Sequence, residues 1–207
     1  MKRNLFAAAA ILMALGLPAQ AANIIDEWAK VKVPPPPALK PVEVDKTYAL
    51  LVVDMVTETC NAKARPRCVE TIPAIQKLLN DARGKGMAVI YALGVSGITF
   101  VPALAPKDGE PIVKSGADKF IDTDLDKILK DKGTKGVIAV GTLAYGGVLH
   151  TASQAALRGY KVVVPVDGMS SLNEGTLYTE QYTAWHLANA PFFGGRVTLT
   201  KIDMIKF

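Results

Sequence analysis

Continuous apolar runs alternate along the chain with segments in which apolar residues recur every three or four positions. Continuous runs of this length are typical of strands buried on both faces of a parallel sheet, and the wider spacing is typical of helices. The runs cover residues 49–53, 87–93, 137–140, 161–166 and 196–200, and the helical segments cover 72–82, 125–129, 148–157 and 179–187. This alternation predicts an α/β fold with a doubly wound, mostly parallel sheet and helices on both faces.

A sheet of this type has its ligand crevice outside the carboxyl ends of the strands. The candidates for chemistry are therefore the residues that follow the runs, namely Asp54, Gly94, the segment 141–147 and Asp167. The connection from Gly94 to about residue 119 is long. Long connections are uncommon in compact domains, so this one is a candidate functional loop.

The first 21 residues have the layout of a secretory signal peptide. Lys2 and Arg3 precede an uncharged run over 5–17, and a small-residue cleavage site lies at 19–21. The run is shorter than the roughly 20 residues that a membrane-spanning helix needs, so a cleaved signal is favoured over an anchor. We divide the chain into a signal peptide (1–21), a proline-rich leader arm (22–47) and one domain (48–207). We expect an exported protein, periplasmic or secreted, without a membrane segment after cleavage.

Composition and charge narrow the class further. Half of the residues are hydrophobic and 21% are charged, which is enough apolar surface for a core and excludes a disordered chain. The net charge of +5 includes Lys2 and Arg3 of the expected signal, and the other basic residues are scattered, so we expect no nucleic-acid partner. Export would place Cys60 and Cys68 in an oxidising compartment, where we predict a disulfide between them; two free thiols are the alternative.

Two polar residues stand out near the expected crevice. Asp54 follows an apolar strand directly, where partial desolvation would raise its pKa and suit it to proton transfer, although a turn-capping role is the alternative. Lys114 ends the short extended segment 110–113. From there it could bind an anion or lower the pKa of a neighbour, although most lysines are solvated surface groups.

The glycine-containing segment 141–147 predicts a strand-to-helix turn that a ligand can approach closely. It has neither the dinucleotide-binding nor the P-loop spacing, and the chain contains no Gly-x-Ser-x-Gly motif. The two histidines, His150 and His186, have no ligand spacing, so we expect no metal and no cofactor.

Several short segments, in this order and spacing, resemble the isochorismatase-like hydrolase superfamily, which includes nicotinamidases, related amidohydrolases and isochorismatases. The matching segments are 50–55, 72–86, 109–125, 141–152 and 159–167. The resemblance implies an α/β hydrolase whose site contains an aspartate, a lysine and usually a cysteine nucleophile.

Asp54 matches the aspartate of that set. Lys114 matches the lysine because it lies six residues before Phe120. Lys119 is the rival, but it occupies the position beside this phenylalanine that is usually small. The resemblance therefore assigns the catalytic lysine to Lys114.

The cysteine position of the family falls on Gly147, and neither Cys60 nor Cys68 can be aligned with it. Without the thiolate, the acyl-enzyme amidase route loses its nucleophile. The sequence is similar here to isochorismatases proper, which also have glycine and hydrolyse a vinyl ether without a covalent intermediate. By this resemblance Asp54 protonates the vinyl carbon, water adds to the oxocarbenium-like carbon, and Lys114 holds Asp54 and a substrate carboxylate.

The resemblance also assigns substrate binding to the turn after the third apolar run. The backbone N–H groups of Leu143 and Gly147 are expected to line an anion site, and the Thr142–Leu143 peptide bond is expected to be cis. The substrate-binding residues predicted in this way are Thr142, Leu143, Tyr145, Gly146 and Gly147.

These arguments lead to an exported hydrolase of a small, anionic molecule that works without a cysteine nucleophile. The alternative is an inactive relative that binds a small molecule or a protein, because Gly147 occupies the nucleophile position. A third hypothesis uses Tyr145, Thr142 or Ser115 as a replacement nucleophile. The resemblance further implies a homo-oligomer, to which the leader arm could contribute.

Overall fold

The computed structural model describes residues 21–95 and 99–207, so the predicted signal peptide lies outside the described residues except for Ala21. The chain forms two compact units that meet in the sequence between Pro35 and Pro36, and each unit is described by itself. Among its described residues, 21–35, the first unit contains one short 3₁₀ turn, Trp28–Lys30, whose three residues are exposed. The second unit, residues 36–207, contains the sheet and all the α-helices of the described chain.

The central sheet has the strand order β4-β3-β2-β5-β6-β8, and β7 pairs with β5. Every pairing in it is parallel. The strands are β2 (Tyr48–Val53), β3 (Ala88–Leu93), β4 (Ile112–Lys114), β5 (Gly136–Thr142), β6 (Lys161–Pro165), β7 (Met169–Ser170) and β8 (Val197–Thr200). The predicted parallel α/β sheet is thus confirmed. The short strand β4 falls on the segment that was expected to be extended, whereas β7 was not predicted.

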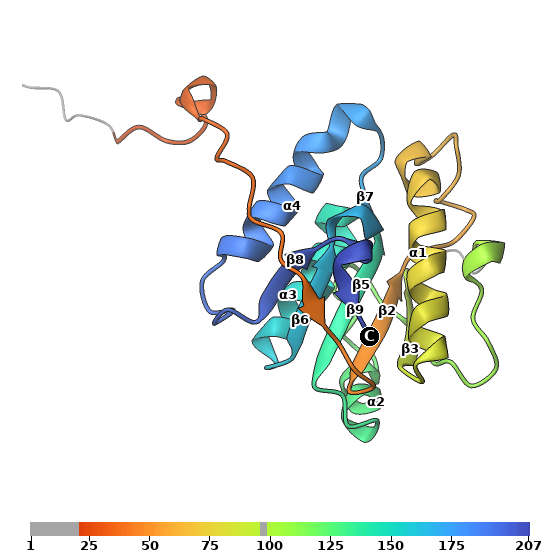
Figure 1. Ribbon diagram of the computed structural model, residues 1–207. Coiled ribbons are helices and arrows are strands. Elements are labelled where there is room, and N and C mark those ends of the chain that lie inside the picture. Colours follow the sequence, from red (N-terminus) through yellow and green to blue (C-terminus); the bar gives the residue numbers. More distant parts are fainter. Residues whose placement is uncertain (1–20, 96–98) are drawn as a thin grey trace, which may run out of the picture. The chain divides into compact units, whose positions relative to one another are not determined.

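Helices cover both faces of this sheet (Figure 1). Alternate residues of β2 point to opposite faces: Leu50 and Val52 join the core under α1, whereas Leu51 and Val53 join the core under the other helices. The helices are α1 (Pro66–Gly84), α2 (Leu125–Asp131), α3 (Leu149–Leu157) and α4 (Leu177–Asn189). Because both faces are buried, the strands are apolar throughout, which is why they appear in the sequence as continuous runs.

The chain order creates a switch point between β2 and β5. From β2 the chain moves outward through β3 to β4, and it then returns to β5 on the other side of β2. Crevices outside the carboxyl ends of strands form at such points. The two strands approach closely there: Gly141 has φ +129°, and a Cβ on it would lie 1.9 Å from the Val53 carbonyl oxygen, so only glycine fits.

Residues 36–47, which the sequence assigned to the leader arm, belong to the compact unit of the domain. The Lys40 N–H donates to the Leu199 carbonyl at 3.0 Å, and β1 (Val42–Glu43) pairs in parallel with β9 (Ile205–Lys206). Val44 is buried in the core under α1. This part of the proline-rich segment is therefore held by main-chain hydrogen bonds to the end of the chain. Among the described residues, no helix is both long and apolar enough to cross a membrane.

Candidate functional site

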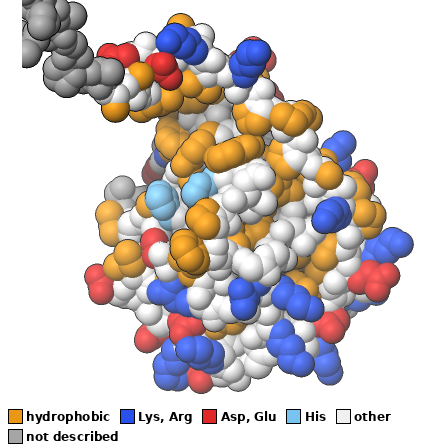
Figure 2. Space-filling view, turned by 90° about the vertical axis from the view of Figure 1, so that its left-hand side faces the viewer, with side chains coloured by type: hydrophobic (Ala, Val, Ile, Leu, Met, Phe, Trp, Pro, Cys, Tyr) orange, Lys and Arg blue, Asp and Glu red, His pale blue; other side chains and the backbone are white. Residues whose placement is uncertain are grey.

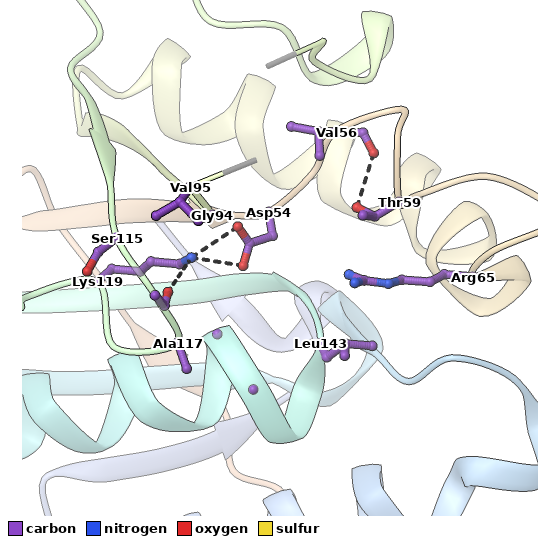
Figure 3. Close-up of a pocket in the computed structure, with 13 residues that line it drawn as sticks. Asp54, Val56, Thr59, Arg65, Gly94, Val95, Ser115, Ala117, Lys119 and Leu143 are labelled. Atoms are coloured by element: carbon purple, nitrogen blue, oxygen red, sulfur yellow. Dashed lines mark hydrogen bonds and ion pairs between the residues drawn. The ribbon is translucent and has the colours of Figure 1, made fainter. Parts of the chain in front are cut away.

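A cavity of about 280 Å³ opens at the carboxyl ends of the strands, next to the switch point (Figure 3). Its walls come from the segments that follow β2, β3, β4 and β5, which parallel pairing brings to one edge of the sheet. The lining residues are Asp54, Val56, Thr59, Arg65, Gly94, Val95, Ser115, Gly116, Ala117, Lys119, Leu143, Gly146 and Gly147.

Asp54, which lines the cavity, lies one residue beyond β2. Its N–H donates to the Ala92 carbonyl at 3.0 Å, which fixes the backbone after β2 to the neighbouring strand β3. Asp54 has φ +53°, a left-handed conformation that costs most residues about 1–2 kcal/mol and that aspartate tolerates better. The surrounding sheet therefore holds the carboxylate in a defined direction, toward the cavity.

The lysine that meets Asp54 is Lys119. Its Nζ lies 3.0 Å from both Asp54 Oδ1 and Oδ2 and donates to the Gly116 carbonyl at 2.8 Å. The Lys119 side chain is only 1% exposed, so solvent has almost no access to the ion pair from the side of the lysine. The ammonium group is satisfied by the carboxylate and by a carbonyl from its own loop.

The expectation that Lys114 holds Asp54 was wrong. Lys114 ends β4, in which Val113 is buried while Ile112 and Lys114 are exposed. Side chains alternate along a strand, so packing Val113 into the core turns Lys114 away from it. Lys114 does not line the cavity, and Lys119, set aside on the sequence, takes the place.

Burial raises the pKa of the Asp54 carboxyl above its ordinary value. The charge of Lys119 and its hydrogen bond lower it, as do a hydrogen bond from the Gly94 N–H and the charge of Arg65, but burial is the larger effect. A carboxyl in this condition can hold a proton at a higher pH than an ordinary aspartate, which is the property expected of a proton donor.

Gly147 lies directly against the carboxylate. A Cβ built on it would come within 2.8 Å of Asp54 Oδ2, 2.7 Å of Val53 Cγ1 and 3.6 Å of Lys119 Cε. Contacts below 3.0 Å require these atoms to shift, although Asp54 is held by Lys119 and Val53 by the core. A side chain at position 147 would therefore require Asp54 and Val53 to move in this backbone.

The turn after β5 divides the five residues predicted to bind substrate. Leu143, Gly146 and Gly147 line the cavity. Thr142 is fully buried and its hydroxyl donates to the Ser170 carbonyl at 3.4 Å, while the half-buried Tyr145 lies outside the lining. The Thr142–Leu143 peptide bond is cis, as predicted.

The predicted disulfide is present: Cys60 and Cys68 are joined at an S–S distance of 2.00 Å, and the described chain has no free cysteine. The closed loop carries Arg65, a cavity residue that the sequence analysis did not single out. Burial lowers the pKa of the Arg65 guanidinium, against the opposing charges of Asp54 and Tyr145. Nothing in the spacing of Arg65 distinguishes it from a surface arginine.

The proposed replacement nucleophiles have no base beside them among the described residues. The Ser115 hydroxyl lines the cavity but donates to the Ile121 carbonyl at 2.7 Å. Neither histidine lines the cavity: His150 is exposed on α3, and His186 packs against Tyr182 and Phe193. Within residues 21–95 and 99–207, no group of three or more His, Cys, Asp or Glu side chains could hold a metal ion.

Residues 48–195 match the family model of the isochorismatase domain. The secreted isochorismatase effector Isc1 of Verticillium dahliae is 29% identical over 134 residues, which cover 58% of this chain and 70% of the relative. The streptothricin hydrolase of Streptomyces noursei is 30% identical over 152 residues, which cover 67% of this chain but only 58% of the relative.

Solved structures of the same kind share the fold. An isochorismatase-like hydrolase from Alkaliphilus metalliredigens superposes with a TM-score of 0.66 at 28% identity, covering 75% of this chain and 95% of the other. A cysteine hydrolase from Pseudomonas syringae pv. phaseolicola gives a TM-score of 0.71 at 20% identity, covering 81% and 94%. The resemblance drawn from the sequence is confirmed by these matches.

Proposed function

The chain belongs to the isochorismatase family, a family of hydrolases, and we propose that it is an exported hydrolase of a small, anionic molecule. In this proposal Asp54 transfers the proton, Lys119 positions Asp54, and water, instead of a cysteine, attacks the substrate. The observation that carries the proposal is the buried Asp54–Lys119 ion pair, which faces the cavity directly against Gly147.

Asp54 acts as the proton donor and then as the acceptor. For a vinyl ether, its carboxyl proton is transferred to the vinyl carbon, which leaves an oxocarbenium-like carbon beside the ether oxygen. A water molecule adds its oxygen to that carbon and returns a proton to the Asp54 carboxylate. The hemiketal then collapses, breaking the C–O bond and releasing a carbonyl compound and an alcohol. The raised pKa of Asp54 supports the donor role.

Lys119 is the positioning residue. Its contacts with both oxygens of Asp54 and with the Gly116 carbonyl fix the direction of the carboxyl group. Its positive charge also keeps the pKa of Asp54 from rising so far that the proton is never released. Lys119 thus takes over the role that the resemblance assigned to Lys114.

Water is the nucleophile because the site offers no thiol. The cysteines are joined in a disulfide. We assign the family's nucleophile position to Gly147, where a Cβ would come within 2.8 Å of Asp54 Oδ2. A small amide or ester remains an alternative substrate to a vinyl ether, with Asp54 then activating the water as a general base.

Export is supported by the signal-like residues 1–21, by the disulfide and by the secreted relative. Amino-terminal sequencing of protein recovered from outside the cytoplasm should give a chain that begins at Ala22. Recovery of only uncleaved, cell-retained protein would contradict this part of the proposal.

The activity is tested by incubating the purified protein with vinyl ethers, esters and amides that bear a carboxylate. We expect turnover of at least one class, resistance to iodoacetamide, and loss of turnover in Asp54→Asn. Unchanged turnover in Asp54→Asn, or inactivation by the thiol reagent, would reject the mechanism.

A binding protein without catalysis is the second candidate, and the closed position at Gly147 is the observation that favours it. In that case the cavity would bind a small molecule that is recovered unaltered, and every substrate class would remain uncleaved.

A homo-oligomer is also part of the proposal. Figure 2 shows the side of the molecule that carries α4, where hydrophobic side chains gather beside histidines. The large apolar side chains exposed on and after α4 are Leu177, Tyr178, Tyr182, Trp185 and Phe192. Light scattering should give the mass of a dimer or a larger assembly. A monomeric mass at high protein concentration would refute the proposed homo-oligomer.

A further inference from the structure

The disulfide-closed loop at residues 60–68 carries one side chain that lines the cavity, that of Arg65. Inside the loop, the Asn61 side chain donates to the Thr57 carbonyl at 2.9 Å and accepts from the N–H groups of Lys63 and Ala64 at 3.1 and 2.9 Å. The Arg65 N–H donates to the Asn61 carbonyl at 2.9 Å. Both cysteines are buried in the core under α1, so the loop is anchored at each end.

The guanidinium group of Arg65 has no hydrogen-bonding or ion-pair partner within the described part of the chain. Arg65 lines the cavity and is half-buried, and its side chain makes no hydrogen bond or ion pair with the described residues, although the charge of Asp54 acts on it. Two other arginines show the contrast: Arg67 forks onto Glu180 at 2.8 and 2.7 Å, and Arg83 forks onto Glu110 at 2.8 and 2.7 Å. In Figure 3 Arg65 extends across the cavity from the side opposite to Lys119, toward Asp54.

The net charge of the cavity lining is set by Asp54, Lys119 and Arg65. Asp54 and Lys119 neutralise each other at 3.0 Å, which leaves the Arg65 charge uncompensated in a partly desolvated space. A half-buried cation without a partner is unfavourable, and a planar guanidinium is matched best by a carboxylate that accepts two hydrogen bonds.

We propose that Arg65 determines specificity by binding the carboxylate of the substrate, and that the Cys60–Cys68 disulfide positions Arg65 for this role. The inference rests on the proposed hydrolase function and deepens it. It places the anionic end of the substrate at the loop and the reacting bond between Asp54 and Gly147. The disulfide is thereby a part of the binding site as well as a crosslink.

Equilibrium titration with benzoate and its neutral analogue benzamide tests the role of Arg65. We expect the wild type to bind benzoate more tightly than benzamide, and Arg65→Gln to weaken benzoate at least tenfold while leaving benzamide unchanged. Arg65→Lys, which keeps the charge but loses the fork, should lie between them. The matched control is Lys63→Gln, which removes the same charge from an exposed position in the same loop and should bind both molecules as the wild type does.

Two results would overturn the assignment of Arg65. One is a wild type without preference for benzoate; the other is an equal loss of benzoate affinity in Arg65→Gln and Lys63→Gln, which would show only a general charge effect. Binding needs no turnover, so these titrations are made on protein that has not been shown to cleave any substrate. Failure of the hydrolase proposal, which appears as absent turnover, is therefore distinguishable from failure of this one.

The disulfide is tested by the double variant Cys60→Ala/Cys68→Ala. We expect its affinity for benzoate to fall toward that of Arg65→Gln, and adding Arg65→Gln to it should cause no further loss. The same titration is made on wild-type protein reduced with a phosphine, with circular dichroism reporting the fold. Unchanged benzoate affinity in folded, disulfide-free protein would overturn the positioning role. Disulfide-free protein that only unfolds would assign the bridge to stability alone.

Discussion

Two ion pairs at different ends of the strands differ in how completely the carboxylate is hydrogen-bonded and in whether it faces a cavity. Arg83 and Glu110 lie before β3 and β4, and Glu110 accepts two hydrogen bonds from Arg83 and one from the Lys107 N–H. Asp54 and Lys119 lie after β2 and β4, where the carboxylate faces the cavity. The Arg83–Glu110 pair joins the end of α1 to a loop. The Asp54–Lys119 pair lines the cavity, where a ligand can contact it.

The pKa values of the two carboxyl groups differ in direction. Burial raises the pKa of Glu110, but the hydrogen bonds from Arg83 and the Lys107 N–H outweigh it and hold the pKa below its ordinary value. At Asp54 burial outweighs Lys119, and the pKa is raised. A fully satisfied carboxylate stabilises the fold, whereas an incompletely satisfied one retains the capacity to exchange a proton.

The largest difference between the two pairs should appear in turnover. Asp54→Asn is expected to lower kcat/KM by about 10²–10⁴-fold, the usual contribution of a positioned proton-transfer group. Glu110→Gln should leave kcat/KM within about twofold, because Glu110 is remote from the cavity. Steady-state kinetics on the best substrate measures both, and an equal loss in the two variants would break the comparison.

The second largest effect is expected when the space beside Asp54 is filled. Gly147→Ala forces a methyl group within 2.8 Å of Asp54 Oδ2, and we expect kcat to fall by about tenfold or more because small displacements of reacting groups are costly. The control is Gly84→Ala at the end of α1, where a Cβ meets open space. Wild-type kcat in Gly147→Ala would show that the close approach is unimportant.

Removing each pair completely should separate structure from function. Arg83→Met/Glu110→Gln is expected to lower the free energy of unfolding by about 2–3 kcal/mol, because several charge-assisted hydrogen bonds are lost. Asp54→Asn/Lys119→Met should change it by only about 1 kcal/mol or less, since replacing both partners of a buried pair is often neutral or stabilising. Urea unfolding measures the two values, and reversal of their order would contradict this division.

The smallest effects concern pH. Glu110, with a lowered pKa, stabilises the fold above the ordinary glutamate value near 4.3, and this contribution is lost as the pH falls through its folded-state pKa. Asp54, with a raised pKa, binds its proton more tightly in the folded state, so its contribution is lost as the pH rises from near 3.9 through the raised value. Comparing the wild type with Glu110→Gln and with Asp54→Asn by urea unfolding at several pH values should give slopes of opposite sign; slopes of one sign would refute the contrast.

Much of the fold could be predicted because local pattern and tertiary role agree. Strands buried on both faces must be apolar throughout, so the runs containing Leu50 and Ile138 identified two central strands directly. The segment that ends at Lys114 was expected to be extended, and the structure has the strand Ile112–Lys114 there. Three residues at a sheet edge show too little pattern to predict which of their side chains point away from the core.

Four features can be read from the amino-acid sequence alone: the parallel α/β sheet, the position of Asp54 after its strand, the Cys60–Cys68 pairing and the absence of a cysteine at position 147. Each follows from composition, local pattern or matching order along the chain. Only the tertiary structure decided which lysine meets Asp54 and that Arg65 reaches the cavity. The physical reason is that the position of each side chain depends on the path of a loop. Lys119 lies in the loop after β4, and Arg65 lies in the loop before α1. A loop's direction is set by a few hydrogen bonds and a crosslink between segments, and no periodicity along the chain records it.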